Sequence, residues 1–154
     1  MEKHDLNPIV NLSGHGIDQY DLHARVSIPN YDNKAETEIT PGLYAIEPFA
    51  TPGNGRVRDG NSSGILRLID DKNVRSPIAR EVLDFIIEEY QTLPFCSRWI
   101  VKKFGTKGLL GLKQLVENGN LQDYPVLIES SGKKVAQTEH SILVEKDGII
   151  VTTK

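Results

Sequence analysis

The strongest constraint on the fold of this chain is that its hydrophobic periodicity changes twice along 154 residues. Apolar and β-branched runs bounded by Gly, Asn, Asp and Pro predict strands before residue 70 and again after residue 124. These strands are expected at 26–29, 43–49, 65–69, 126–129, 135–145 and 148–152. The segment between them has helical spacing. The sequence therefore predicts an α+β fold in which short helices interrupt a β segment.

The helical segment is expected to contain three helices. Ser76 can cap the first helix and Pro77 suits its first turn. One face of this helix carries the apolar residues Ile78, Val82, Phe85, Ile86 and Tyr90. A shorter helix is expected at 97–104, and a leucine-rich helix from near Thr106 is expected to stop by Gly119.

Composition narrows the possible partners and the compartment. With 18 basic and 21 acidic residues, the net charge of −3 gives no global basic field that would attract nucleic acid or anionic membrane. The single cysteine, Cys96, excludes an internal disulfide framework and fits a reducing compartment, so a cytoplasmic location is predicted. The N-terminus does not read as a signal peptide, and no apolar run approaches the roughly 18 residues of a membrane span.

Two histidines are candidates for chemistry. His15 lies between Gly14 and Gly16, which would let the backbone come close to whatever the imidazole binds. His23 could hydrogen-bond a substrate carbonyl. A lone histidine is more often structural than functional, so for both residues a structural role stays open from these residues alone.

Two glutamates are further candidates. Alternation places Glu47 and Phe49 on one face of the expected 43–49 strand, which suits either a metal site beside an apolar pocket or a salt bridge. Glu139 interrupts the apolar run at 135–145, where a carboxylate is costly to desolvate unless a metal or another strong partner receives it. The same alternation separates His140 from Glu139, so His140 is interpreted as structural.

Five blocks of sequence, in order, resemble the type II methionine aminopeptidases, especially those of archaeal character. The blocks are NLSGHGI at 11–17, residues 22–29, AIEPFAT at 45–51, TLPFCSRW at 92–99 and QTEHSIL at 137–143. The resemblance covers essentially the whole chain. It implies the C-terminal half of a pita-bread fold, with core strands at 1–69 and 125–154 and a helical, winged-helix-like insertion at 70–124.

The resemblance also implies a site. It assigns metal binding to His15, Glu47 and Glu139, support of the reacting carbonyl to His23, and general acid/base work to Glu47. The residues that it places near the methionine pocket are Leu22, His23, Phe49, Ile65, Pro94 and Tyr124. The implied reaction uses two divalent ions, Co, Mn, Fe or Zn, to remove the initiator methionine from nascent polypeptides, possibly near the ribosome.

One part of the family pattern is missing. The family's metal-binding aspartates and the first half of its fold should precede His15, where only fourteen residues stand. Asp21 and Asp32 have a similar spacing, which we interpret as coincidence. The chain could be a truncated or fragmentary enzyme, a subunit that completes its site with a separate N-terminal half, or a domain reused without catalysis. We expect the isolated chain to have little or no aminopeptidase activity and to bind metal weakly. The alternative is a non-catalytic pita-bread module that binds protein or RNA.

A group of cations in the insertion raises a second question. They are Arg98, Lys102, Lys103, Lys107 and Lys113. A solvated helix face is favoured over nucleic-acid binding, because the sequence shows no aromatic stacking positions or Gly-rich phosphate loop beside them. No specific nucleic acid and no membrane are therefore expected among the partners.

Overall fold

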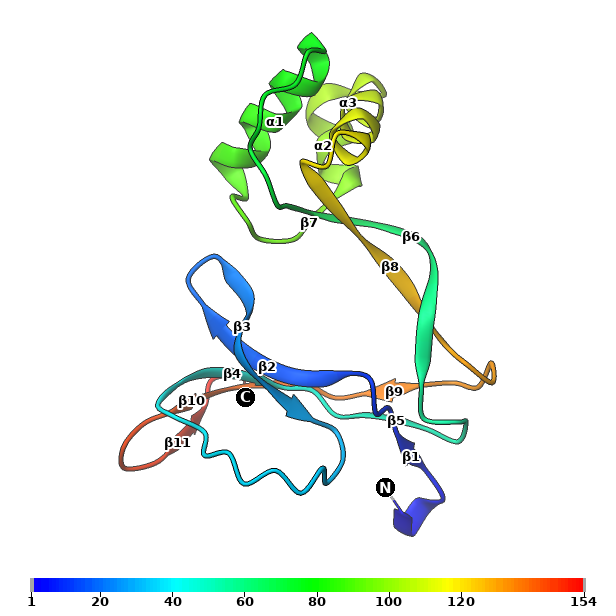
Figure 1. The fold of residues 1–154 in the computed structure, drawn as a ribbon, viewed down its shortest axis with the longest axis vertical. Coiled ribbons are helices and arrows are strands. Elements are labelled where there is room, and N and C mark those ends of the chain that lie inside the picture. Colours follow the sequence, from blue (N-terminus) through cyan, green and yellow to red (C-terminus); the bar gives the residue numbers. More distant parts are fainter. Residues whose placement is uncertain (1, 154) are drawn as a thin grey trace. The chain divides into compact units, whose positions relative to one another are not determined.

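A computed structural model describes residues 2–153 and divides the chain into two compact units (Figure 1). The first unit is Met1–Asp59 together with Leu127–Lys154, and the second unit is Gly60–Val126. The boundary falls inside two long strands, β6 (Val57–Leu68) and β8 (Leu121–Glu129). The mixed helix and strand content confirms the predicted α+β class.

The first unit is built from antiparallel strands. Its five-stranded sheet has the order β11-β10-β4-β2-β3. The bounds of these strands are β2 Ser13–Asp18, β3 Asp21–Pro29, β4 Gly42–Ile46, β10 His140–Val144 and β11 Ile149–Val151. A smaller sheet, β1-β5-β9, joins Asn7–Pro8, Phe49–Thr51 and Ala136–Gln137, and a 3-10 turn covers Glu2–His4.

Two of the expected strands are broken at matching positions. Strand β4 ends at Ile46, which pairs with His140, and β5 starts at Phe49, which pairs with Gln137. Glu47 and Glu139 both lie between these pairs, in the two breaks, and the register places them opposite each other. The expectation of one continuous strand over 135–145 with Glu139 inside it is wrong, because β9 and β10 pair in different sheets and Glu139 is exposed between them.

The second unit contains the three expected helices, α1 Pro77–Glu89, α2 Ser97–Phe104 and α3 Lys107–Glu117. Strand β7 (Phe95–Cys96) joins β6 and β8 in the order β7-β6-β8. Ser76 stands at the N-cap of α1, but its side chain makes no capping hydrogen bond, contrary to expectation. Gly119 follows α3 with φ +78°, as the sequence predicts for a residue after a helix end.

A contiguous hydrophobic core fills the second unit. Its buried members are Leu66, Leu68, Val74, Ala79, Val82, Leu83, Ile86, Phe95, Ile100, Leu112, Leu115 and Leu121. Helices α1 and α3 approach closely at Gly111, where an added Cβ would lie 2.9 Å from Cγ2 of Val82. The predicted α1 face is correct, whereas Leu109 and Leu110 of α3 are exposed.

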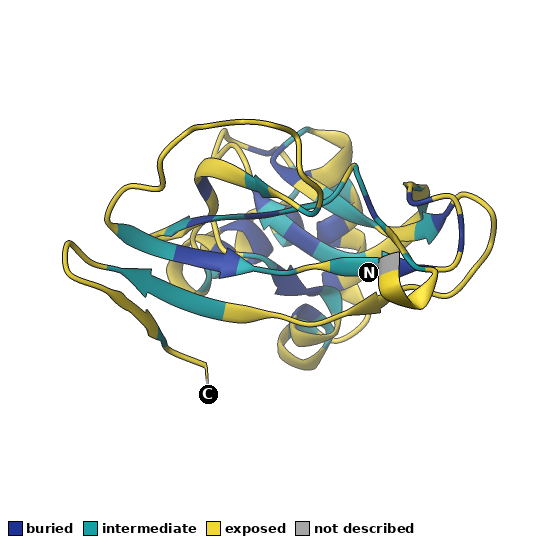
Figure 2. Ribbon diagram, turned by 90° about the horizontal axis from the view of Figure 1, so that it is seen from below, coloured by how far each residue is buried: buried dark blue, intermediate teal, exposed yellow. Residues whose placement is uncertain are grey.

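The first unit buries much less apolar surface. Its buried apolar residues within the described part of the chain are Ile9, Ala24, Tyr44 and Ala45. Strands β10 and β11 are intermediate or exposed along their length (Figure 2). Neither residues 2–59 nor residues 127–153 contain an α-helix that could cover the sheet. Sheets normally bury one face against another layer, and this one has no helical layer of its own.

The described helices are all too short or too polar to cross a lipid bilayer.

Candidate functional site

His15 is held on an inner strand of the five-stranded sheet by two glycines. Added Cβ atoms would lie 2.4 Å from the Ala45 carbonyl oxygen at Gly14 and 2.4 Å from the Ala24 carbonyl oxygen at Gly16. The glycines therefore let β2 approach its neighbours β4 and β3. Close strand pairing accounts for both glycines, and a ligand of the His15 imidazole stays a prediction.

The same strand pairing brings His15 to Glu47. His15 pairs with Ala45, and Glu47 lies two residues further along that chain segment, so the two side chains are diagonal neighbours on one face. His15 Nε2 lies 3.2 Å from Glu47 Oε1, and the side chains are only 12% and 15% exposed. Glu47 thus has an imidazole partner at ion-pair distance, and the contact is a salt bridge only with a protonated His15.

The hydrogen bond of the other ring nitrogen, Nδ1, fixes the tautomer of His15. His15 Nδ1 donates to the Gly16 carbonyl oxygen at 3.0 Å, because a carbonyl can only accept. A neutral ring protonated at Nδ1 turns a lone pair at Nε2 toward the carboxylate, and the contact becomes favourable when a proton or a metal cation is bound there. An Nδ1–H bonded to a backbone carbonyl is also the usual support of a metal-binding histidine.

The surroundings of Glu47 raise the pKa of its carboxyl group. Burial raises its pKa above the ordinary value, and the charge of Glu139 raises it further, whereas His15 and the hydrogen bond from Gln137 Nε2 at 3.0 Å lower it. The matched strand breaks thus set two carboxylates close enough to repel each other. A divalent cation would relieve that repulsion, and carboxylate oxygen with imidazole nitrogen is a suitable donor set for Co, Mn, Fe or Zn.

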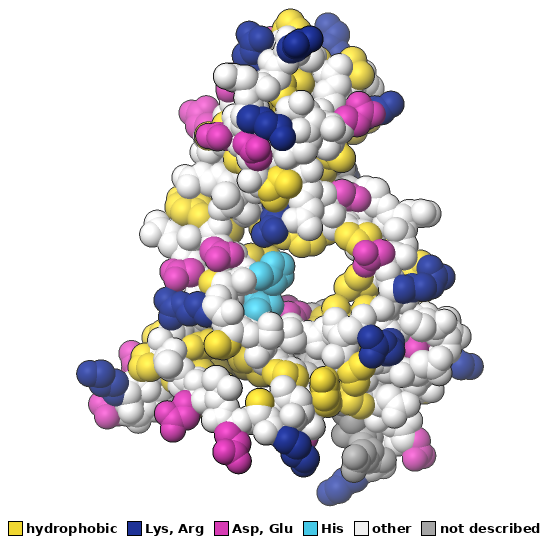
Figure 3. Space-filling model, in the orientation of Figure 1, with side chains coloured by type: hydrophobic (Ala, Val, Ile, Leu, Met, Phe, Trp, Pro, Cys, Tyr) yellow, Lys and Arg dark blue, Asp and Glu magenta, His cyan; other side chains and the backbone are white. Residues whose placement is uncertain are grey.

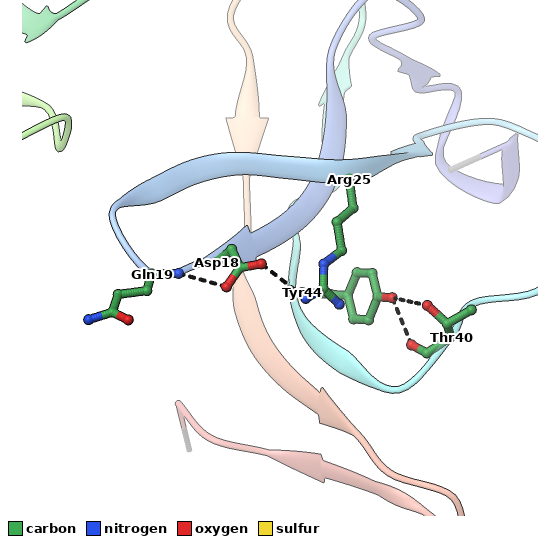
Figure 4. Close-up of polar contacts among 5 residues, drawn as sticks. All are labelled: Asp18, Gln19, Arg25, Thr40 and Tyr44. Carbon is green, nitrogen blue, oxygen red and sulfur yellow. Dashed lines mark hydrogen bonds and ion pairs between the residues drawn. The ribbon is translucent and has the colours of Figure 1, made fainter.

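His23 reaches the same place through a β-bulge. The register of β2 with β3 shifts between the pairs His15–Ser27 and Gly16–Ala24, which leaves Arg25 and Val26 without partners on β2, with Arg25 at φ 61°. Its guanidinium donates to Asp18 Oδ2 at 3.0 Å (Figure 4). The ring of His23 meets the ring of His15 edge-on, with centroids 4.5 Å apart. Bulges commonly re-aim side chains beside functional sites.

Core packing supports this arrangement from β4. Tyr44 is 1% exposed. Its hydroxyl donates to the backbone carbonyl oxygen of Thr40 at 2.7 Å, so the aromatic ring stays buried with its polar atom satisfied (Figure 4). This anchors the strand that pairs with β2 on one side and β10 on the other.

A cavity of about 350 Å³ opens at these residues. Its lining includes His15, His23, Glu47 and Phe49, so the expected pairing of an acid with an aromatic wall is confirmed. Histidine side chains gather in one patch beside acidic ones on the face shown in Figure 3. Arg25 and Leu127 also line the cavity, and sequence reasoning missed both, because the bulge and the long strand β8 bring them there.

The remaining predicted residues are not among those that line this cavity. Leu22 is exposed and does not line this cavity. Ile65, Pro94 and Tyr124 belong to the second unit, so their place near a methionine pocket stays a prediction. His140 contacts Thr153 through Nδ1 at 3.2 Å, in agreement with its structural interpretation.

The donor atoms at this site are of the types that bind metals, but the described side chains do not form a complete metal site. His15 Nε2 and Glu47 converge, and Glu139 acts on Glu47 through its charge. Within residues 2–153, however, no three His, Cys, Asp or Glu side chains form a group that could hold a metal ion. The donor types suit a divalent ion, and the assignment of His15, Glu47 and Glu139 as a ligand set stays a prediction.

Sequence reasoning missed a buried acid, Glu129, which is 4% exposed. It accepts hydrogen bonds from the backbone N–H groups of Asn54 at 2.7 Å, Ser131 at 2.8 Å and Lys133 at 3.0 Å, and from the Ser131 hydroxyl at 2.6 Å. These contacts, the Ser131 hydroxyl foremost, lower its pKa to about 2. The only signal in the sequence is an acid between an apolar run and a Ser-Ser-Gly turn.

Comparison with known proteins gives the family context. No protein-family model matches the chain. The chain is 41% identical over 155 aligned positions to a methionine aminopeptidase of Methanocaldococcus jannaschii, covering 100% of this chain and 52% of that protein. It is 46% identical to the methionine aminopeptidase of Pyrococcus horikoshii, covering 100% of this chain and 53% of that protein.

Solved structures agree on the fold. A thermophilic Arx1 matches with a TM-score of 0.80 at 18% identity, over 97% of this chain and 42% of that one. A methionine aminopeptidase from Thermotoga maritima matches with a TM-score of 0.51 at 20% identity, over 99% and 37%. These matches confirm the pita-bread fold class. The chain spans about half the length of the curated relatives it matches.

Proposed function

We infer, from the kinship of this chain with the archaeal methionine aminopeptidases, that it is the C-terminal half of an enzyme that removes N-terminal methionine from polypeptides. The observation that carries this proposal is the cluster of His15, His23 and Glu47 in one cavity. Nascent polypeptides with a small second residue are the proposed substrates, and the cytoplasm is the proposed location.

The proposed metal site would use His15 Nε2, Glu47 and Glu139, with further ligands from outside this chain. Bound divalent ions would act as Lewis acids on water and on the peptide carbonyl. The half-buried Glu47 carboxylate would take a proton from the attacking water and pass it to the leaving amine.

His23 and Phe49 would handle the substrate. A ring N–H of His23 would donate to the carbonyl oxygen as negative charge develops on it during attack. The edge contact with the His15 ring sets the orientation of His23 before substrate arrives. Phe49 lines the same cavity and offers an apolar wall for the methionine side chain.

Incompleteness is part of the proposal and has structural support. The sheet of the first unit has no helical layer of its own within the described residues, and Ile149 and Ile150 are 65% and 49% exposed. A separate N-terminal half would cover this surface and supply the missing ligands. Such a partner needs a large apolar interface of the kind found in obligate complexes.

The test is release of methionine from a Met-Ala-Ser peptide with Mn(II) or Co(II). The purified chain is assayed alone and together with the part of the Pyrococcus horikoshii enzyme that this chain does not match, supplied as a separate polypeptide. We expect negligible turnover alone and clear turnover in the pair. Robust turnover by the chain alone would refute the incompleteness.

Variants in the pair test the residue roles. Glu47→Gln is expected to lower kcat by about 10²–10⁴-fold and His23→Ala by about 10²–10³-fold. Glu145→Gln, an exposed change in the same unit, is the matched control and should leave kcat unchanged. A correctly assembled, metal-loaded pair without turnover would favour the alternative, a non-catalytic binding module.

A further inference from the structure

The second unit carries a cavity that the proposed peptidase function does not use. It measures about 480 Å³ and is lined by Phe85 of α1, Tyr90 just after it, and Trp99, Lys102 and Lys103 of α2. The Trp99 ring lies 5.7 Å from the Tyr90 ring, tilted by 36°. Lys103 Nζ lies 5.1 Å from the centroid of Phe85. We name these five residues the aromatic–lysine site.

Core packing does not account for Trp99. Its neighbour on α2, Ile100, is fully buried in the core, whereas Trp99 is 50% exposed. A large aromatic ring held half in solvent keeps one face open to a flat ligand. The Tyr90 ring packs beside Trp99 and is itself fixed by the core, because it stacks on the buried Phe95 ring with the two centroids 5.1 Å apart. The open ring is thus mounted on a rigid base.

The positive charge of Lys102 and Lys103 favours a flat ligand that carries negative charge. Residues 90–116 contain five cations and no acid. Neither Lys102 nor Lys103 forms an ion pair with any residue in the described range 2–153. A cationic ligand would be repelled by these two ammonium groups. Helix α1 carries the opposing charges Glu81, Asp84, Glu88 and Glu89, of which Glu89 contributes after burial to the raised pKa of Tyr90.

We propose that the aromatic–lysine site binds single-stranded nucleic acid, with a base stacked on Trp99 and the adjacent phosphates at Lys102 and Lys103. Stacking on an aromatic ring beside lysines that follow the backbone is the general way in which proteins hold single strands. The sequence favoured a solvated helix face because it showed no aromatic partner for these lysines. The structure supplies that partner from α1 and from the turn after it.

The chain offers a direct probe of this site. Trp99 is the only tryptophan, so quenching of tryptophan fluorescence reports stacking at this residue alone. The full chain is titrated with oligouridylate RNA, oligothymidylate DNA and a short DNA duplex, at low and at physiological salt. We expect saturable quenching by the single strands, weaker binding at higher salt, and little quenching by the duplex. The RNA and DNA arms show which sugar the site prefers.

Variants separate the site from general charge attraction, with binding followed by the anisotropy of labelled RNA. Trp99→Leu is expected to weaken binding about five- to a hundred-fold, the range for loss of one stacked base. The double variant Lys102→Gln, Lys103→Gln should weaken binding and reduce its salt dependence. Glu89→Gln should strengthen binding. Lys113→Gln is the matched control, because Lys113 is exposed and pairs with Glu117 at 3.8 Å.

Three results would overturn the proposal. Oligonucleotides could leave the fluorescence of Trp99 unchanged. Lys113→Gln could weaken binding as much as the double variant, which would mean diffuse attraction to basic helices. An acidic peptide could quench Trp99 while the oligonucleotides do not, which would assign the site to a protein partner. All substituted side chains are exposed, and circular dichroism checks that each variant keeps its helices.

Discussion

The two units of this chain differ in how much apolar surface they bury. The second unit wraps three helices around a contiguous core that includes Ile86, Ile100 and Leu115, each 0% exposed. In its described part, the first unit buries Tyr44 and few other large apolar side chains. It also buries polar residues such as Glu129 and Thr51. The second unit thus has a closed core, whereas the sheet of the first unit has no helical layer among its described residues.

The contiguous hydrophobic core and the candidate catalytic site therefore lie in different units. The residues proposed for catalysis, His15, His23 and Glu47, all lie in the first unit, which lacks a helical layer among its described residues. The second unit carries its own hydrophobic core. If a separate N-terminal half supplies such a layer, as proposed, the site is expected to be fully ordered only in the pair.

Hydrogen exchange should show the largest contrast between the units. We expect amides of Val82–Ile86 in α1 to exchange about a thousandfold or more slowly than those of β11, because exchange reports local opening free energies from near zero up to the global value. Mass spectrometry of peptic fragments measures both regions in one sample. Supplying the N-terminal half should slow exchange in β10 and β11. Equal protection of both units in the chain alone would break the comparison.

Core truncation in the second unit comes next in size. Ile86→Ala removes a fully buried side chain and should lower the free energy of unfolding by about 2–5 kcal/mol. Leu110→Ala, in a residue 53% exposed on α3, should change it by less than about 0.5 kcal/mol. Urea unfolding followed by Trp99 fluorescence reports this unit. Similar losses for the two variants would mean that the described core does not stabilise the insertion.

The smallest expected effect is a local one in the first unit, at Glu129. Its folded-state pKa of about 2 lies below the ordinary value of 4.5. The carboxylate therefore stabilises the folded state fully above pH 4.5, and that stabilisation is lost as the pH falls through about 2. NMR shifts of Asn54 and Ser131 should change in this window while Trp99 fluorescence does not.

The matched pair for this prediction is Glu129→Gln and Glu117→Gln. The first removes a carboxylate that accepts from Asn54, Ser131 and Lys133, so it should loosen that loop and abolish the acid transition of its shifts. The second removes an exposed i,i+4 pair, which is worth less than about 1 kcal/mol. An unchanged acid transition in Glu129→Gln would assign it to another group.

The sequence could predict what depends on local pattern. The spacing of Val82 and Ile86 predicted α1, and the run at 97–104 predicted α2 with its observed bounds. It could not predict the matched breaks at Glu47 and Glu139, because a strand break depends on which sheet each segment joins. Glu139 therefore read as an acid inside a buried strand, although it lies exposed between two strands.

The same limit applies to the site. Sequence pattern and family resemblance named His15, His23 and Glu47, which the fold brings together. The bulge at Arg25 and the approach of aromatic rings to Lys102 depend on tertiary packing, so periodicity gave no sign of them. Residues close in space and distant in sequence were missed unless the resemblance supplied them.

The most direct test of the central claim, that this chain holds half of a dinuclear site, is metal stoichiometry. Mn(II) or Co(II) bound per chain is measured by calorimetry with the chain alone and with the separate N-terminal half. The account predicts weak binding alone and two tightly bound ions in the pair, with His15→Ala abolishing tight binding of at least one. Two tightly bound ions in the chain alone would contradict it.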